Sequence, residues 1–256
     1  MPSPWAFTMP DHAPLYIPPP YPYRGVRKLS VFCRANPAGI RRALPQPLET
    51  VSDVIELFVM RAPDAGWLGD YSEGGVVIPC RYKGVTGGHV AYEYVSSDDS
   101  LCVGREIWGY PKKMAEVAFE ESSAGIRGLV RRRGTPLIDL AFAPGPGSAE
   151  GYAEASGAPF AGKPKLLPRL QMKRFARVDG RGFDMNQIIL NDFRKPEVLE
   201  TRAGSATARL GSRHDDPLDE LGPMEVLGAE FAVFNFVLDY GLVFEELERS
   251  VSRAAE

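Results

Sequence analysis

Short apolar segments separated by turn residues recur along the chain and predict a protein built mainly from β-strands. Some segments alternate apolar and polar residues, others are continuously apolar, and glycine, proline, serine or aspartate stands between them. This succession of strands and turns indicates antiparallel hairpins. We expect strands over residues 29–34, 54–60, 75–82, 89–95, 114–119, 126–133, 137–142, 170–177, 183–192, 206–210 and 224–238.

Helical signals are few and lie outside these strands. Asn36 followed by Pro37 predicts a short helix through Leu44, with Asn36 as its N-cap and Pro37 at its first position. Residues 242–253 place apolar side chains at helical spacing and predict a closing amphipathic helix. The run 101–103 is expected to be a buried strand.

The pattern as a whole predicts an α+β fold. Residues 230–238 carry apolar side chains on both faces, so both faces of that strand are expected to be buried. Many short strands with few helices favour an antiparallel, barrel-like sheet, closed or partly closed, that encloses a dry cavity and has peripheral helices. We expect residues 1–256 to form one such domain.

Proline concentrates in two segments that are expected to be irregular. Residues 1–23 cannot be helical and are predicted to form an extended N-terminal arm along a surface or a partner subunit, which favours a homo-oligomer. An alternative for this arm is a polyproline ligand of a recognition module. Residues 144–165, rich in small residues and proline, are the best candidate for a long loop or lid.

Composition excludes several classes of function. Thirty basic and 33 acidic residues give a net charge of −3, so no global field favours nucleic acid or an anionic membrane. No N-terminal signal pattern and no run of about 18 apolar residues is present, which predicts a cytoplasmic protein. Three scattered cysteines and three scattered histidines share no metal-ligand spacing, so we expect no metal and no cofactor.

The adjacent lysines Lys112 and Lys113 are the strongest candidates for chemistry. A lysine amine attacks a ketone only when it is unprotonated, and a neighbouring ammonium together with an apolar pocket lowers its pKa. Trp108 and Met114 place apolar bulk around the pair. A solvated turn is the common environment of two lysines, and only this apolar setting favours a nucleophile.

The run GREIWGYPKKM at residues 104–114 resembles the signature of the acetoacetate decarboxylase family. Further similarities to the family include residues 71–74 with Ile78-Pro79, and residues 208–210 with residues 216–218. Because these similarities follow one another over nearly the whole chain, we identify the chain as a member. The resemblance implies the barrel-like fold, a Schiff base on Lys112 and a pKa-lowering role for Lys113.

The same resemblance implies an active-site glutamate at Glu73, with Tyr71 beside it. It also shows two departures, because the family's arginine falls on Val26 and its second glutamate falls on Phe58. Arg27, next to Val26, could replace the arginine only through a bulge or a shifted register. Tyr240 lies where aldolase-dehydratase relatives place a polar tyrosine.

Three functions are compatible with the sequence, and these two departures favour one of them. A protonated imine stabilises the enamine left by loss of carbon dioxide and equally the enamine left by removal of an α-proton. We favour a pyruvate-type aldolase-dehydratase or hydratase acting on small oxo acids. A true acetoacetate decarboxylase is the alternative, and a non-catalytic small-molecule binder is the alternative from another class.

Overall fold

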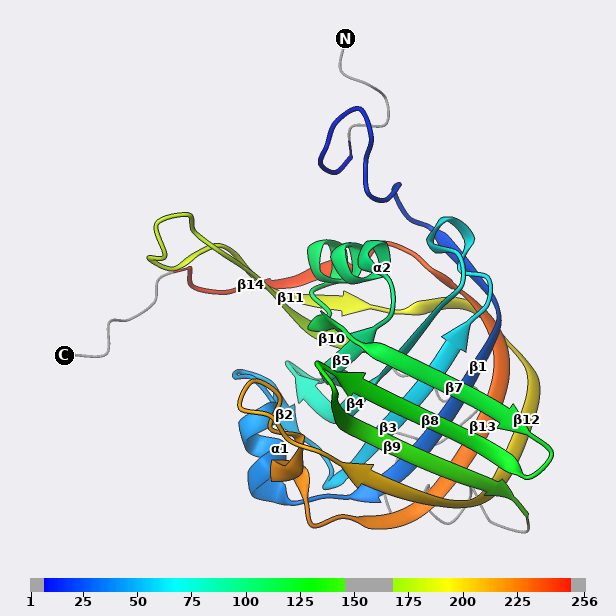
Figure 1. Cartoon of the computed structure of the whole chain (residues 1–256). Coiled ribbons are helices and arrows are strands. Elements are labelled where there is room, and N and C mark those ends of the chain that lie inside the picture. Colours follow the sequence, from blue (N-terminus) through cyan, green and yellow to red (C-terminus); the bar gives the residue numbers. More distant parts are fainter. Residues whose placement is uncertain (1–6, 146–167, 250–256) are drawn as a thin grey trace.

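The computed structural model describes residues 7–145 and 168–249 and shows one large, strongly curved sheet (Figure 1). All fourteen described strands belong to it. The strands are β1 Tyr21–Arg34, β2 Glu49–Thr50, β3 Val54–Ala62, β4 Tyr71–Tyr82, β5 Val85–Val95, β6 Lys112–Met114, β7 Glu116–Ser122, β8 Gly125–Arg132, β9 Thr135–Pro144, β10 Arg169–Ala176, β11 Phe183–Asn191, β12 Phe193–Leu210, β13 Glu225–Leu238 and β14 Leu242–Glu246.

The sheet is open, since β14 and β7 form its two ends. Its order is β14-β11-β10-β5-β4-β3-β1-β13-β12-β9-β8-β7, and β2 and β6 pair with β4 and β5 away from this path. Most pairs of neighbouring strands are antiparallel, whereas β5 pairs in parallel with β10 and with β6. The barrel-like α+β fold is thus confirmed, as a curved mixed sheet that does not close.

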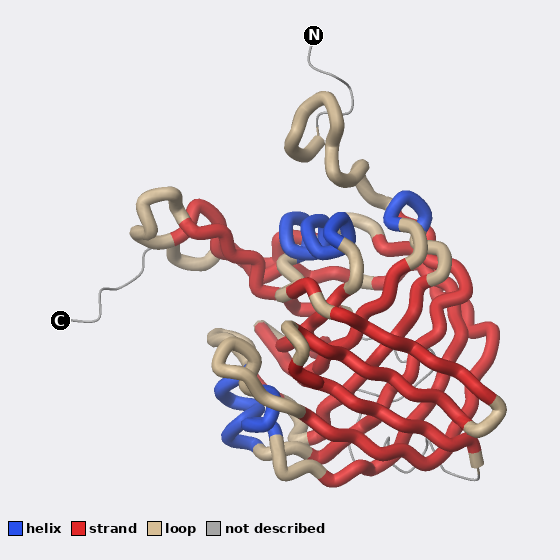
Figure 2. The backbone as a smooth tube through the Cα atoms, in the orientation of Figure 1, coloured by secondary structure: helices blue, strands red, loops and turns tan. Residues whose placement is uncertain are grey.

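Helices occupy the periphery, as Figure 2 shows in blue. The helix α1, Pro37–Ala43, confirms the predicted start, because Asn36 Oδ1 accepts a hydrogen bond from the backbone N–H of Ala38 at 3.0 Å. The helix α2, Asp98–Val103, continues into a π-helical turn over Gly104–Trp108. Short 3₁₀ turns lie at Gly66–Leu68 and Leu218–Leu221.

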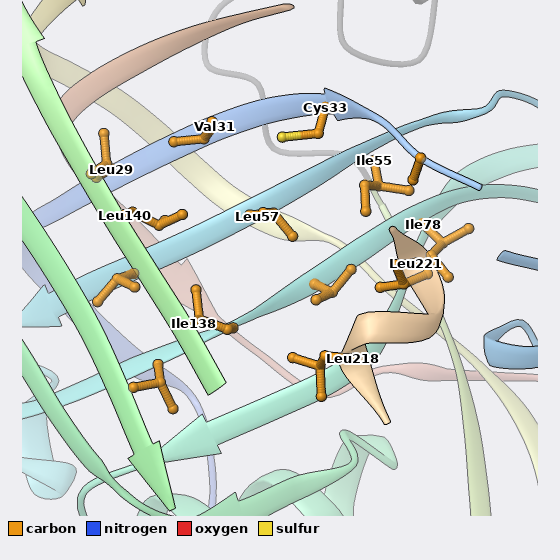
Figure 3. Packing of buried hydrophobic residues seen from close by; sticks show 14 of the residues in the cluster. Leu29, Val31, Cys33, Ile55, Leu57, Ile78, Ile138, Leu140, Leu218 and Leu221 are labelled. Carbon is orange, nitrogen blue, oxygen red and sulfur yellow. The ribbon is translucent and has the colours of Figure 1, made fainter. Parts of the chain in front are cut away.

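The curvature of the sheet encloses the first of two hydrophobic clusters. Figure 3 shows β8 and β9 crossing over β1, β3 and β4, with Leu29, Leu57 and Leu140 packed between them and Leu218 and Leu221 closing one end. The opposite face of the same central strands carries the second cluster, which includes Val26, Phe58 and Tyr71. Burial on both faces explains why these strands are almost continuously apolar.

The long strand β13 also contributes to both clusters, as its pattern predicted. Phe231 and Val233 belong to the first cluster, and Phe234, Phe236 and Leu238 belong to the second.

Four expectations about local structure are corrected. Residues 242–246 form strand β14 beside β11, so the predicted C-terminal helix is wrong over that part. Residues 101–103 are helical, and residues 21–23 of the expected arm belong to β1. The expected strand 114–119 is interrupted at Ala115, between β6 and β7. Most of the expected lid, residues 144–165, lies outside the described residues, as do residues 1–6 of the arm.

The described part of the arm folds back onto the π-helical turn. Tyr16 is buried and its hydroxyl donates to Glu106 Oε2, and Thr8 Oγ1 donates to the same oxygen at 3.5 Å. The arm is therefore fixed beside the segment that leads into β6.

Candidate active site

A cavity on the second face of the central strands brings Lys112 together with aromatic and charged side chains. Strand register explains the assembly, because five residues stand in one cross-strand row over β1, β3, β4, β5 and β6. The row is Ser30, Phe58, Gly75, Glu93 and Lys112. The cavity is lined by Tyr23, Lys28, Phe58, Met60, Tyr71, Glu73, Val90, Glu93, Tyr110, Lys112, Arg169, Phe193, Phe234, Phe236 and Leu238.

The Lys112 ammonium is buried and held by two hydrogen bonds. Its Nζ donates to Glu73 Oε2 and to Ser100 Oγ, each at 3.0 Å. The rings of Tyr71 and Tyr110 face the same nitrogen, with centroids at 5.6 and 5.8 Å. Glu73 and Tyr71, both expected at the site, are thus beside the amine.

Gly104 leaves the space through which the Lys112 side chain passes. A Cβ at position 104 would lie 2.6 Å from Lys112 Cδ and 2.8 Å from Cε. The signature glycine therefore has a steric role, and the backbone of Gly104 is ordinary right-handed helix.

The electrostatics of Lys112 differ from the sequence-based expectation. Burial would lower its pKa, but the surrounding acidic groups, with the charge of Glu73 foremost, outweigh burial, so that the pKa is raised above its ordinary value. The ammonium therefore has to lose a proton before the amine can attack a carbonyl carbon, and Glu73 is the carboxyl group hydrogen-bonded to it.

Lys113 does not face Lys112, because successive side chains of a strand point to opposite faces. Its Nζ donates to Asp216 Oδ1 and to the carbonyl oxygen of Asp215, both at 2.6 Å. Asp216 is fully buried and also accepts hydrogen bonds from Arg132 and Tyr94. The expectation that Lys113 lowers the pKa of Lys112 by proximity is thus corrected, and Lys113 anchors β6 on its other face.

Glu93 is a site residue that the sequence reasoning missed. It is 4% exposed and lies directly opposite Lys112 in the register of β5 and β6. Burial raises its pKa to about 8, an effect that the nearby Lys112 charge only partly opposes. A glutamate inside the predicted strand 89–95, between Tyr92 and Tyr94, was the signal that could have revealed it.

The sequence reasoning also missed Lys28, which lines the cavity, and Glu56, its ion-pair partner. Lys28 Nζ donates to Glu56 Oε1 at 2.5 Å, and Ser30 Oγ donates to the same oxygen at 2.6 Å. Burial would raise the pKa of Glu56, but the charge of Lys28 and these hydrogen bonds lower it, so this carboxyl stays ionised.

This pair lies near Val26 and Phe58, the two positions at which the family resemblance implies an arginine and a glutamate. On the antiparallel strands β1 and β3, Lys28 is two residues after Val26, and Glu56 is two residues before Phe58. Both offsets run in the same direction in space and equal one pleat repeat, about 7 Å. Val26 is buried in the same apolar cluster, and Phe58 lines the cavity with its ring 5.0 Å from Lys28 Nζ.

Arg27 points away from the cavity, so it does not replace the family arginine. Its guanidinium binds Glu121 on the other side of the sheet. The charged residue that alternation brings to the cavity face is Lys28, and a third cation, Arg169, enters from β10.

Three other expected site residues lie outside the cavity lining. Tyr240 is 50% exposed after the end of β13, and Met114 is 45% exposed at the end of β6. Trp108 is buried behind the wall, where its Nε1 donates to the carbonyl oxygen of Asp239 at 2.9 Å. Tyr240 is thus absent from the lining, whereas Tyr23 adds a third phenol to those of Tyr71 and Tyr110, with its hydroxyl 2.8 Å from that of Tyr71.

The described residues contain no group of three or more histidine, cysteine, aspartate or glutamate side chains arranged to hold a metal ion. Within the same ranges, no helix is long and apolar enough to cross a membrane.

Comparison with models of protein families identifies one family for this chain. A family model described as acetoacetate decarboxylase matches residues 8–247. The chain belongs to the acetoacetate decarboxylase family.

Named relatives and solved structures agree with this assignment. A Ralstonia nicotianae protein named acetoacetate decarboxylase is 27% identical over 246 residues, which cover 95% of this chain and 96% of that protein. A solved acetoacetate decarboxylase has a TM-score of 0.84 at 21% identity and covers 94% of this chain and 95% of its own. MppR, an enduracididine biosynthesis enzyme solved with pyruvate, has a TM-score of 0.76 at 15% identity and covers 96% and 99%. Family and enzyme relatives together identify the chain as a Schiff-base enzyme.

Proposed function

We propose that this enzyme is a lyase that forms an imine between Lys112 and a small 2-oxo acid and retains the substrate carboxylate, as an aldolase-dehydratase or hydratase does. The observation that carries the proposal is the charge of the cavity. Three cations, Lys112, Lys28 and Arg169, line it together with the carboxyl groups of Glu73 and Glu93, whereas Val26 and Phe58, at the two positions that the family resemblance marks, are apolar.

Arg169 is suited to hold a substrate carboxylate. It is 5% exposed, lines the cavity, and its charge acts on both Glu56 and Glu93. A guanidinium binds a carboxylate with paired, charge-assisted hydrogen bonds, which are strong in a buried site. Because loss of carbon dioxide discharges the carboxylate, a cation that stabilises the carboxylate opposes decarboxylation and favours chemistry at the neighbouring carbon.

The solved complexes of MppR favour, by analogy, the same kind of reaction, in which the substrate carboxylate is retained. These complexes hold pyruvate and the condensation product of pyruvate with imidazole 4-carboxaldehyde. In our proposal, the imine on Lys112 loses an α-proton to give an enamine, and the enamine carbon then adds to an aldehyde. Glu73, hydrogen-bonded to the amine, exchanges protons with the nitrogen and the carbonyl oxygen.

Acetoacetate decarboxylation is the second candidate. It is favoured by the names of relatives that align over nearly the whole chain, such as the Ralstonia protein and a Paraburkholderia phytofirmans protein at 28% identity. That reaction uses the same imine and releases carbon dioxide by breaking the bond between the carboxyl carbon and the carbon next to the imine.

Proton exchange on pyruvate separates the two candidates without requiring knowledge of the aldehyde. In D₂O we expect the enzyme to replace the methyl protons of pyruvate by deuterium, as followed by proton NMR, and to release little carbon dioxide from acetoacetate. Fast release of carbon dioxide from acetoacetate, with no exchange on pyruvate, would reverse the assignment. Lys112→Ala serves as the control and should do neither.

A further inference from the structure

We propose that Glu93 is a second catalytic acid and base of this site, which dehydrates the carbinolamine on Lys112 and then removes the α-proton of the imine. This inference rests on the proposed function and assigns a residue that the family signature does not contain.

Geometry places Glu93 next to Lys112 in the cavity. It is the cross-strand neighbour of Lys112, it lines the cavity, and its Oε2 is buried without a hydrogen-bond partner among the described residues. An unpaired buried carboxyl oxygen is costly and is retained where it serves a ligand or a reaction. Gly75, the next residue of the row, has no side chain to cover it, and a Cβ there would lie 3.2 Å from Glu93 Cα.

The edge of β5 explains how two cations come to share the cavity with Glu93. Strand β10 pairs with this edge at Gly88, whereas β6 pairs with it at residues 93–95. Arg169, the first residue of β10, therefore stands opposite Gly88, and Lys112, the first residue of β6, stands opposite Glu93, so both cations enter the cavity from the same edge of β5. Arg169 would hold the substrate carboxylate, and the carbon next to the carbonyl carbon of a bound 2-oxo acid would lie near Glu93.

Several charged and titratable groups surround Glu93, and proton transfer at the site is divided between Glu93 and Glu73. They are Lys112 from β6, Glu73 from β4 and Arg169 from β10, with the phenols of Tyr71 and Tyr110. Desolvation keeps Glu93 protonated at neutral pH, with a pKa of about 8, while Glu73 carries the hydrogen bond from the ammonium. One site thus contains a proton acceptor for the amine and a separate proton donor.

The first step forms the carbinolamine. The ammonium of Lys112 gives a proton to Glu73, the nitrogen forms a bond to the ketone carbon, and the carbonyl π electrons move to oxygen. Glu73 returns its proton to that oxygen and takes one from the nitrogen, which leaves a neutral carbinolamine and a protonated Glu73.

Glu93 acts in the next two steps. Its proton moves to the carbinolamine hydroxyl, the C–O bond breaks, water leaves, and the nitrogen lone pair forms the C=N bond of the iminium ion. The resulting Glu93 carboxylate takes a proton from the carbon next to the imine carbon, which is the methyl carbon of pyruvate, and the C–H electrons form the enamine double bond while the C=N π electrons return to nitrogen. Glu93 is protonated again, so protons and charge balance over the two steps.

The test compares Glu93→Gln with the wild type in the deuterium exchange of pyruvate. We expect exchange to fall by at least about 100-fold, the usual contribution of a general acid or base, while borohydride still traps pyruvate on Lys112 after long incubation. Wild-type exchange should decline as pH rises through about 8, since ionised Glu93 cannot dehydrate the carbinolamine. Glu116→Gln on the exposed face of β7 is the matched control and should leave both the rate and the profile unchanged.

Exchange by Glu93→Gln at the wild-type rate, with the same alkaline decline, would overturn the role of Glu93 and leave the proposed function standing. A wild-type enzyme that neither traps nor exchanges pyruvate overturns the proposed function and the role of Glu93 with it. If Glu93→Gln does not fold, infrared spectroscopy of the wild type decides. A protonated carboxyl band at pH 6 that disappears near pH 8 is expected, and a protein without such a band contradicts the proposal.

Discussion

Replacing Gly104 with alanine is expected to abolish imine formation while leaving the fold intact. The new Cβ would overlap the Lys112 side chain at Cδ and Cε, so the lysine must leave its position between Glu73 and Ser100. Displacement of a reacting group by about 1 Å costs roughly 100-fold in rate, and we expect at least that loss in pyruvate exchange. The helical backbone at position 104 accepts alanine, so the loss in free energy of unfolding should be confined to the disturbed contacts of Lys112 with Glu73 and Ser100 and should not exceed about 3 kcal/mol.

The measurement pairs the exchange rate with thermal unfolding for Gly104→Ala and a control, Gly145→Ala. A Cβ at Gly145 meets no atom within 4 Å, so this control should match the wild type in both readouts. A Gly104→Ala protein that exchanges pyruvate at the wild-type rate would show that Lys112 needs no such passage.

Replacing Asp216 with asparagine is expected to produce a large loss of stability. The carboxylate is fully buried and binds the ammonium of Lys113, the guanidinium of Arg132 and the hydroxyl of Tyr94. Removing one partner from a buried charge network leaves the remaining charges uncompensated and costs about 3–5 kcal/mol. Because Lys113 is 34% exposed and Arg132 is 14% exposed, solvent reduces this, and we expect about 2–4 kcal/mol.

Urea denaturation measures this loss, with Asp70→Asn as the control. Asp70 pairs with Arg61 on the surface, where both side chains are about half exposed, so its replacement should cost less than about 1 kcal/mol. Equal losses for the two variants would contradict the anchoring role of Asp216 and, through it, the position of Lys113.

The sequence correctly predicts most strands, the N-cap of α1 and the burial of Lys112 in an apolar setting, because those features depend on local pattern. The error at residues 242–246 shows where the local pattern is insufficient. Their apolar spacing fits a helix, yet the edge of β11 provides backbone partners for a strand, and tertiary pairing decides the outcome. Lys113 illustrates the same point, because its neighbour in the sequence lies on the opposite face of β6.

The composition of the cavity was less accessible from the sequence, since it depends on register across five strands. Glu93 meets Lys112 only through the parallel pairing of β5 with β6, and Arg169 joins them only through β10. Lys28 and Glu56 stand two residues from the positions that the family motif marks. The sequence signal for these site residues was a charged residue inside a strand predicted to be buried, and both Glu56 and Glu93 lie in such strands.

Borohydride reduction in the presence of pyruvate, followed by mass spectrometry of the digested protein, tests the central claim most directly. An imine between the ketone and a buried amine predicts a covalent pyruvate adduct on Lys112, on no other lysine, and none in Lys112→Ala. Reduced protein without an adduct, or with the adduct on Lys28 or Lys113 instead, would contradict the assignment of Lys112 as the nucleophile.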